Sequence, residues 1–445
     1  MDKFVVTGAT PLNGIWEVAG AKNVALKMPV IALLTDSEVI LHNIPLISDV
    51  FFMLEVLSSL GVKSQIKGHT LYIKNGHVSE ITVPLEVGAR LRSSSLVLGP
   101  MLARWGHAKI PNPGGCRIGA RPIDRHVEAL TAMGATINYN SADGYFHAQA
   151  KKLRGTTIVF PKNTHTGTET IILAAVLAEG TTVIENAAQE AEIDDLTACL
   201  NLMGAKIRRV ASRQIVIEGV KRLSGVEYTI MPDRNEEVTV AVAAAASGGT
   251  VTVKNSQPQF LTAFLSAFRQ AGGKIELLEK GVTRYSREGK LSATDIVTQP
   301  YPGFMTDWQA PWAVLMSQAY GRSTIHETVF ESRFSYVKEL VKMGAEIEFF
   351  DPQVPNPDKF YNFNWSDLTH GNHQAIRIKG PVKLHNAVVT IDDLRAGATL
   401  LIAALIARGA SYIHGVEQID RGYEKIEERL VKLGAKIKRL TSDHL

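Results

Sequence analysis

The sequence is poor in cysteine, and its two cysteines, Cys116 and Cys199, are too few for a disulfide framework. This scarcity favours a reducing compartment, and we expect the cytoplasm. No uninterrupted apolar run approaches the roughly 18 residues that a membrane-spanning helix needs. The opening stretch MDKFVVTG also lacks the apolar core of a signal peptide. The sequence therefore predicts neither a disulfide-stabilised secreted protein nor a membrane protein.

An excess of one charge is also missing, because 48 Lys and Arg residues face 44 Asp and Glu residues. The formal net charge of +4 is small and evenly spread, which argues against a nucleic-acid-binding protein. There is no P-loop, no GxGxxG after an expected strand, and no Cys/His cluster with metal-ligand spacing. We therefore expect no bound metal and no cofactor. With 445 residues, 45% of them hydrophobic, the chain can build a large core divided between two domains.

A short pattern, apolar–Gly–small–polar–apolar, recurs six times along the chain. Its copies are SSLGVKS, TAMGATI, NLMGAKI, RQAGGKI, VKMGAEI and VKLGAKI, with the glycines Gly61, Gly134, Gly204, Gly272, Gly344 and Gly434. These glycines lie 73, 70, 68, 72 and 90 residues apart, which predicts six related units. The longest interval contains the Pro-, Asn- and Asp-rich segment 351–373, which predicts a surface insertion loop.

Each of these glycines is expected to end a helix and to let the chain turn into a strand. Counting back from the residue before the glycine, helical periodicity predicts buried stripes in four copies. They are Val50/Met53/Leu57/Leu60, Ile193/Leu196/Leu200/Met203, Leu261/Phe264/Phe268/Ala271 and Tyr423/Ile426/Leu430/Leu433. The other two copies place His126 and Arg333 in the stripe. A second helix–Gly–strand pattern, as in LAEGTTVIENA, lies between the six glycines. The sequence thus predicts an α/β fold with three units in each domain.

Basic residues stand where several of the expected helices begin, namely Lys22, Arg121, Arg333 and Arg421. A helix N-terminus carries partial positive charge, so a cation there is unfavourable unless an anion is present. Either each cation pairs with its own carboxylate, or together they bind a highly anionic small ligand between the domains. We favour the ligand, because the four positions are related by the repeat.

Seven segments, in order along nearly the whole chain, resemble motifs of the enolpyruvyl transferases, above all of those acting on UDP-N-acetylglucosamine. They are GAKN (20–23), GGCRIGARPIDRH (114–126), PDRNE (232–236), YPGFMTDWQA (301–310), ETVFESRF (327–334), DDLRAGA (392–398) and IDRGYE (419–424). The resemblance implies a two-domain inside-out α/β barrel, with three units around an inward-facing helix bundle in each domain. We expect one domain at 22–231, with a cysteine lid loop at 111–120, and another combining 1–21 with 232–445.

The resemblance also implies the reaction. Phosphoenolpyruvate and UDP-N-acetylglucosamine would give the 3-O-enolpyruvyl sugar nucleotide and phosphate, by addition and then elimination, in peptidoglycan synthesis. Such a reaction needs both an acid and a base. It implies small-molecule partners only, with no cofactor, metal, nucleic acid, membrane or obligate protein partner.

Matching the motifs residue by residue implies which residues bind phosphoenolpyruvate. Lys22, Arg121 and Arg421 match the family's phosphate-binding residues. Arg333 and Arg395 match those that hold the carboxylate side and shape the closed site.

The sugar nucleotide is implied to bind a larger set of residues. Asn23, which also serves phosphoenolpyruvate, matches the residue that hydrogen-bonds the reacting hydroxyl and the intermediate. The remaining matches are Arg92, Arg121, Pro122, Ile123, Asp124, Arg125, Lys162, Thr164, Asp307 and, through its backbone, Val329.

Two residues are implied to move protons, with Lys22, Asn23 and Arg395 completing the catalytic set. Asp307 matches the carboxylate that serves as base for the 3-hydroxyl. Cys116 matches a cysteine assigned to proton donation or product release, and the neighbouring arginines would lower its thiol pKa. Cys199, on a predicted buried stripe, is interpreted as a core residue.

Some features depart from the family, and two other functions would fit parts of the sequence. The segment KNTHTGTE (162–169) has His165 where the family has Val, and His126 is interpreted as a supporting or core residue. The sister enzyme acting on shikimate 3-phosphate lacks the cysteine loop and has Lys-Ser where this chain has Lys22-Asn23. A non-catalytic sugar-nucleotide-binding protein would have lost Asp307, Lys22 or Arg395.

Overall fold

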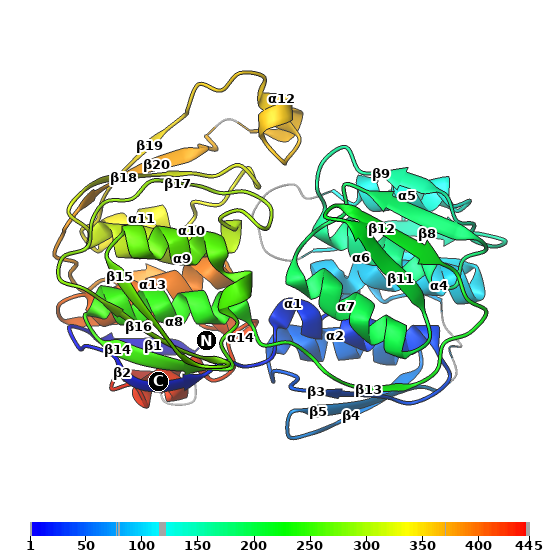
Figure 1. Ribbon diagram of the computed structural model, residues 1–445, viewed down its shortest axis with the longest axis horizontal. Coiled ribbons are helices and arrows are strands. Elements are labelled where there is room, and N and C mark those ends of the chain that lie inside the picture. Colours follow the sequence, from blue (N-terminus) through cyan, green and yellow to red (C-terminus); the bar gives the residue numbers. More distant parts are fainter. Residues whose placement is uncertain (1, 77, 79–80, 115–121, 370, 442–445) are drawn as a thin grey trace. The chain divides into compact units, whose positions relative to one another are not determined.

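The computed structural model describes residues 2–76, 78, 81–114, 122–369 and 371–441. They form two compact units. Unit 1 takes its described residues from Met1–Ala19 and Pro232–Leu445, and unit 2 takes them from Gly20–Gly115 and Arg121–Met231. The described termini both belong to unit 1, where β1 (Lys3–Thr7) and β23 (Lys436–Leu440) are neighbouring strands (Figure 1).

Six small sheets confirm the six predicted units. In five of them an edge strand runs parallel to its neighbour and the other pairs are antiparallel. The sheets of unit 2 have the orders β13-β3-β5-β4, β6-β8-β7 and β9-β10-β12-β11, and those of unit 1 have the orders β2-β14-β16-β15, β17-β18-β20-β19 and β21-β22-β1-β23. In the three-stranded sheet a single parallel bridge from Thr82 to Lys109 stands in place of the fourth strand.

The bounds of the strands in unit 2 are β3 Val39–His42, β4 Val62–Lys67, β5 Thr70–Asn75, β6 His107–Pro111, β7 Thr136–Asn140, β8 Tyr145–Gln149, β9 Thr157–Val159, β10 Thr181–Glu185, β11 Lys206–Ala211, β12 Gln214–Glu218 and β13 Val226–Thr229. Those in unit 1 are β1 Lys3–Thr7, β2 Asn13–Glu17, β14 Thr250–Lys254, β15 Gly273–Glu279, β16 Val282–Arg287, β17 Ile296–Val297, β18 Gly321–His326, β19 Glu346–Phe350, β20 Ala375–Gly380, β21 Val388–Thr390, β22 Ala410–His414 and β23 Lys436–Leu440.

All six repeat glycines have a positive φ between 89° and 100°. They are Gly61 (92°), Gly134, Gly204, Gly272, Gly344 and Gly434. This conformation, which suits glycine, ends a helix and releases the chain into a strand, as predicted. The helices before these glycines are α2 Ser48–Ser59, α5 Asp124–Ala132, α7 Ala191–Leu202, α9 Thr262–Gln270, α11 Val337–Lys342 and α15 Ile426–Val431. Every residue of the four predicted stripes is buried, and so are His126 and Arg333.

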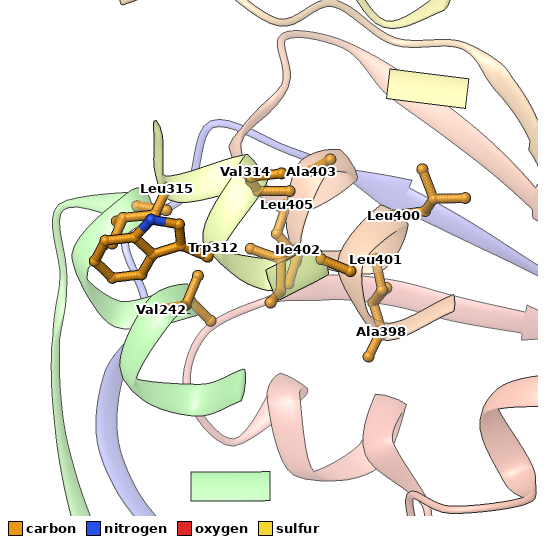
Figure 2. Close-up of a cluster of buried hydrophobic side chains, with 14 of the residues drawn as sticks. Val242, Trp312, Val314, Leu315, Ala398, Leu400, Leu401, Ile402, Ala403 and Leu405 are labelled. Atoms are coloured by element: carbon orange, nitrogen blue, oxygen red, sulfur yellow. The ribbon is translucent and has the colours of Figure 1, made fainter. Parts of the chain in front are cut away.

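A second set of helices forms the interior of each unit. In unit 1 these are α8 Arg234–Ser247, α10 Thr306–Ser317 and α13 Leu394–Ile406, which pack against one another. In unit 2 they are η1 Met28–Leu34, α4 Leu98–Trp105 and α6 His165–Ala175, with α4 packed against both others. Nearly every residue of α8, α10 and α13 is buried, which is expected of a helix surrounded by protein. Figure 2 shows Val242, Trp312 and Ile402 from these three helices within one apolar cluster.

This arrangement confirms the predicted inside-out fold in each unit, with helices inside and sheets outside. The short elements that remain are α1 Lys22–Ala25, α3 Leu85–Gly88, η2 Arg92–Val97, η3 Pro258–Phe260, α12 Pro357–Phe360, η4 Trp365–Asp367 and α14 Glu417–Asp420. The described residues of segment 351–373 are mostly exposed or half-buried, as expected of the predicted surface insertion, but the segment is not entirely loop. It contains α12 and η4, and it buries Tyr361 and Phe363, whose rings both stack with that of Trp365.

Candidate active site

Asp307 lies in the first turn of α10 and faces two arginines of the same unit. Its Oδ1 is 2.7 Å from Nη2 of Arg333, and its Oδ2 is 3.5 Å from Nη2 of Arg395. The carboxylate side chain is 23% exposed, whereas the arginine side chains are only 5% and 7% exposed. Two guanidinium groups therefore share one carboxylate, which brings two buried cations together at one place in unit 1.

Arg395 is fixed at the start of α13 from both its backbone and its side chain. The side chain of Asp393 caps the helix and accepts hydrogen bonds from the backbone N–H of Arg395 (3.0 Å) and of Ala396. Nη1 of Arg395 donates to the Tyr423 hydroxyl at 2.8 Å. Burial opposes the charged form, but Tyr423, Asp307 and Asp233 together raise the pKa of Arg395 above its ordinary value. Arg395 is therefore a permanent cation held in one orientation.

Arg333 is held by a second network that also fixes the backbone at Val329. Its Nε donates to the Thr306 hydroxyl (3.2 Å), which in turn donates to Oε2 of Glu327 (2.8 Å). Oε1 of Glu327 accepts from the backbone N–H groups of Val329 (2.7 Å) and Phe330 (3.1 Å). Burial raises the pKa of the Glu327 carboxyl, although Arg333 and these donors oppose the shift. The segment ETVFESRF thus fixes Val329 and Arg333 through one buried glutamate.

Arg333 and Arg421 were predicted to open helices, and for both this was wrong. The backbone C=O of Arg333 accepts a hydrogen bond from Nε2 of Gln309 (3.1 Å), and α11 begins only beyond it. Arg421 instead ends α14, where its Nη1 contacts Oε1 of Gln418 at 3.2 Å. The next helix, α15, cannot be continuous with α14 because Lys425 between them has a positive φ of 44°.

Lys22 opens α1 in unit 2, as predicted, but it has a carboxylate partner. Its Nζ lies 2.7 Å from Oδ2 of Asp49 at the start of α2, and both side chains are buried. Asn23 follows on α1 and is half-buried. The alternative in which each cation pairs with its own carboxylate therefore applies to Lys22, and in a shared form to Arg333.

The remaining predicted nucleotide contacts in unit 2 lie near two helix starts. Arg92 begins η2, and Nη1 of Arg125 on α5 donates to the backbone C=O of Asn163 at 3.4 Å. Half-buried Lys162 precedes Thr164, which caps α6 by accepting from the backbone N–H of Gly167. The structure therefore joins the segment around Arg125 to the segment around Lys162.

The residues Pro122, Ile123 and Asp124 lie at the start of α5, where Pro122 and Asp124 are exposed and Ile123 is buried. Their neighbour His126 is buried, and its Nε2 lies 3.0 Å from the Thr166 hydroxyl. Burial, with help from the charge of Arg92, lowers the pKa of His126 to about 3. A neutral, buried imidazole supports its interpretation as a core residue.

A charged cluster in unit 2, in which Lys27 and Glu169 are buried and His165 is half-buried, was missed from the sequence. Nζ of Lys27 forms an ion pair with Oε1 of Glu169 and lies 3.4 Å from Nε2 of His165. That His165 nitrogen is 3.0 Å from the same carboxylate oxygen. The sequence signal was a lysine and a glutamate that each directly precede an apolar stretch, in KMPVIALL (27–34) and ETIILAAVLA (169–178). The cluster connects the segment after Lys22 with the helix that Thr164 caps.

Several sequence predictions fall outside the described residues, namely Cys116 and Arg121 in the loop 111–120 and at its end. Cys199, predicted to be a core residue, is buried on α7, and burial with the charge of Asp195 raises its thiol pKa to about 12. Among the described residues, no group of three or more His, Cys, Asp and Glu side chains is placed to hold a metal ion. No helix in the described part of the chain is long and apolar enough to cross a membrane.

Comparisons with known proteins agree over nearly the whole chain. Residues 6–430 match the family model for EPSP synthase (3-phosphoshikimate 1-carboxyvinyltransferase). A UDP-N-acetylglucosamine 1-carboxyvinyltransferase of Acidobacterium capsulatum is 44% identical over 444 residues, covering 99% of this chain and 96% of the relative. Another from Desulforapulum autotrophicum is 42% identical over 440 residues, covering 99% of this chain and 100% of the relative.

Solved structures show the same fold. The enolpyruvyl transferase NikO from Streptomyces tendae superposes with a TM-score of 0.84 at 22% identity, covering 99% of each chain. An EPSP synthase from Acinetobacter baumannii gives a TM-score of 0.72 at 18% identity, covering 99% of this chain and 100% of that one. At these identities the likeness concerns the fold alone.

Proposed function

Since the chain belongs to the enolpyruvyl (1-carboxyvinyl) transferase family, we propose that it is a member acting on UDP-N-acetylglucosamine. It transfers the enolpyruvyl group of phosphoenolpyruvate to the 3-hydroxyl of the sugar nucleotide and releases phosphate. The observation that carries this is 40–44% identity over 99% of the chain to relatives bearing that name. The reaction commits the sugar nucleotide to peptidoglycan synthesis, and we assign it to the cytoplasm.

Phosphoenolpyruvate brings a phosphate and a carboxylate to the site. We assign its phosphate to Lys22, Arg121 and Arg421, and its carboxylate to Arg333 and Arg395. The shared Asp307 carboxylate supports this, because it shows that two buried guanidinium groups meet where a carboxylate can bind both. Arg395 is also held as a permanent cation, which suits a ligand that is anionic throughout the reaction.

The proton steps fall to two residues of this chain. Asp307 accepts the proton of the sugar 3-hydroxyl as that oxygen attacks C2, while Cys116 serves the protonation of the vinyl carbon. The tetrahedral ketal then loses phosphate together with a methyl proton, which regenerates the vinyl group. Asn23 orients the hydroxyl. The fixed position of Asp307 between two arginines supports its role, since a base must be held within hydrogen-bond reach of its proton.

The UDP part of the acceptor is assigned mainly to polar residues of unit 2. Arg92, Arg125 and Lys162 supply positive charge for the diphosphate, and Thr164 lies beside Lys162. The hydrogen bond from Arg125 to Asn163 supports a common role for the segments around Arg125 and Lys162. Val329 of unit 1 contributes a backbone contact to the nucleotide sugar.

The test is phosphate release by the purified protein. Mixing with phosphoenolpyruvate and UDP-N-acetylglucosamine should release one phosphate per enolpyruvyl sugar nucleotide, identified by mass. Shikimate 3-phosphate is the competing acceptor, because the family model and the fold are shared with enzymes named for it. Turnover with shikimate 3-phosphate alone would assign the chain to the sister activity. Binding of the sugar nucleotide without turnover would make the chain a binding protein.

A further inference from the structure

The segment 351–373, here called the insertion arm, accounts for the longest interval between repeat glycines. It leaves unit 1 between β19 and β20 and carries α12 (Figure 1). Its described residues contain an aromatic stack in which the ring of Tyr361 lies 4.9 Å from that of Trp365 and 5.0 Å from that of Phe363. Tyr361 is only 2% exposed. The arm is therefore an ordered part of the unit, held by its own aromatic residues.

The insertion arm is joined to the end of β18 through three contacts. The Tyr361 hydroxyl lies 3.0 Å from Nε2 of His326, and the ring of Phe360 stacks on the same imidazole with centroids 5.3 Å apart. The backbone N–H of Asn362 donates to the backbone C=O of Thr328 at 2.8 Å. Burial lowers the pKa of His326, while burial with the charge of Asp351 raises that of Tyr361 to about 12. Both groups are therefore uncharged at neutral pH, and their hydrogen bond persists there.

The residues that the arm contacts continue directly into the candidate active site. Glu327 lies between His326 and Thr328, and its carboxylate fixes the backbone N–H groups of Val329 and Phe330. Thr328 is further held by Thr298, which accepts at its hydroxyl from the Thr328 N–H at 2.8 Å. The position of Val329 therefore depends on a backbone segment bonded on one side to Thr298 and on the other to the insertion arm.

We propose that the insertion arm is a positioning element for the acceptor, in which Tyr361 and Asn362 hold the backbone of 326–329 so that Val329 meets the sugar nucleotide. This rests on the proposed function, which assigns that contact to Val329. Tyr361 touches no substrate and acts through His326 and Thr328. A purely structural role for the arm would change stability without changing the affinity for one substrate.

The test uses Tyr361→Phe, which removes the hydroxyl contact to His326 but keeps the stacked ring. Losing one hydrogen bond should raise KM for UDP-N-acetylglucosamine about 3- to 10-fold. KM for phosphoenolpyruvate and kcat should stay within about two-fold, as expected for loss of uniform acceptor binding. Trp365→Leu, which removes the ring that stacks on Tyr361, should also raise KM for UDP-N-acetylglucosamine. The matched control is Tyr139→Phe on β7, an exposed tyrosine in unit 2, which should change none of these values.

A second readout does not depend on catalysis. Hydrogen–deuterium exchange of the ligand-free protein should be faster in peptides covering 326–333 in Tyr361→Phe than in the wild type or in Tyr139→Phe. Unchanged exchange would overturn the inference, as would faster exchange with an unchanged KM for the sugar nucleotide. A wild type without transferase activity would refute the proposed function, while the exchange comparison would still report whether the arm fixes 326–333.

Discussion

At the scale of single residues, the decisive feature is a carboxylate shared by two buried arginines. Asp307 can orient Arg333 and Arg395 and, in the proposed reaction, receive the proton of the acceptor hydroxyl. The same contact competes with an anionic substrate for the two guanidinium groups. Its removal should therefore affect catalysis and anion binding in opposite directions.

Asp307→Asn separates these effects. An amide cannot act as the base, so kcat should fall by about 100- to 10,000-fold. KM for phosphoenolpyruvate should not rise, because the competing negative charge is gone. Phosphate release measures both quantities, and a thermal melt checks that the variant is folded. Asp295→Asn, at an exposed aspartate of the same unit, is the control and should leave kcat unchanged. A kcat near that of the wild type would remove Asp307 from the role of base.

The cluster of buried Lys27 and Glu169 with half-buried His165 makes stability depend on pH in two windows. Burial opposes ionisation of Glu169, but Lys27 and His165 lower its pKa from 4.5 to about 2. That shift corresponds to about 3 kcal/mol, present above pH 4.5 and lost as the pH falls towards about 2. Burial opposes the charged form of His165 as well, yet Glu169 raises its pKa despite the charge of Lys27. The stability contributed by His165 is therefore complete below pH 6.5 and is lost as the pH rises through the raised pKa.

His165→Gln tests the upper window. The free energy of unfolding lost by this variant, measured in urea, should be larger at about pH 6 than at about pH 9. The groups facing His165 are Glu169, Lys27 and Glu190, and none is changed by the substitution. His147→Gln is the control, because His147 pairs with Asp143 at the surface and such pairs contribute little. An equal loss at both pH values would contradict the prediction.

The sequence could not predict which residues of the candidate site pair with one another. Lys22 and Asp307 were both found as motif residues. The ion pair of Lys22 with Asp49, and the contact of Asp307 with two arginines, form only because separate helices and loops come together in the fold. Tyr423 was predicted only as a core residue, because a stripe pattern reports its ring and not the hydroxyl that reaches Arg395. The roles assigned to Cys116 and Arg121 remain sequence-based, since both lie outside the described residues.

At the scale of elements, the sequence predicted most where one local rule decides the backbone. The six glycines ended helices as expected because a positive φ is easily reached only by glycine. The helix starts at Arg333 and Arg421 were predicted wrongly because distant or unusual features decide them. Gln309, from another helix, takes the carbonyl of Arg333, and the positive φ of Lys425 has no strong sequence signal.

Substitutions at two glycines should separate backbone strain from steric conflict. At Gly204, with φ of 100°, a Cβ would meet nothing within 4 Å, so Gly204→Ala should cost only the strain, about 1–2 kcal/mol. Gly204→Asn should cost less, because asparagine tolerates positive φ better. At Gly20, a Cβ would lie 1.7 Å from the backbone oxygen of Asn43, so Gly20→Ala should cost most. Urea unfolding measures all three, and Gly20→Ala being the mildest would refute the reasoning.

At the scale of the whole molecule, the sequence repeats form two units, and each unit has its own hydrophobic core. Each described sheet contains strands of one unit only, including the sheets that combine β1 with β23 and β13 with β3. The core around α8, α10 and α13 likewise consists of unit 1 residues. The chain crosses between units near Ala19 and Met231, and those crossings leave the hydrogen-bonded ladders of each unit intact.

Separate cores predict that the ligand-free protein unfolds in two calorimetric transitions rather than one. Leu200→Ala in unit 2 and Phe264→Ala in unit 1 each remove a fully buried side chain, at a cost of about 2–5 kcal/mol. Each variant should lower the midpoint of one transition and leave the other in place. Saturating UDP-N-acetylglucosamine should raise both midpoints in the wild type, since its proposed contacts include residues of both units. A ligand stabilises each unit that must be folded for the ligand to bind. If both variants lowered one common transition by similar amounts, the units would be a single cooperative structure. If the ligand raised only one midpoint, the proposed contacts of the other unit, Val329 and Asp307 or Arg92 and Lys162, would have to be withdrawn.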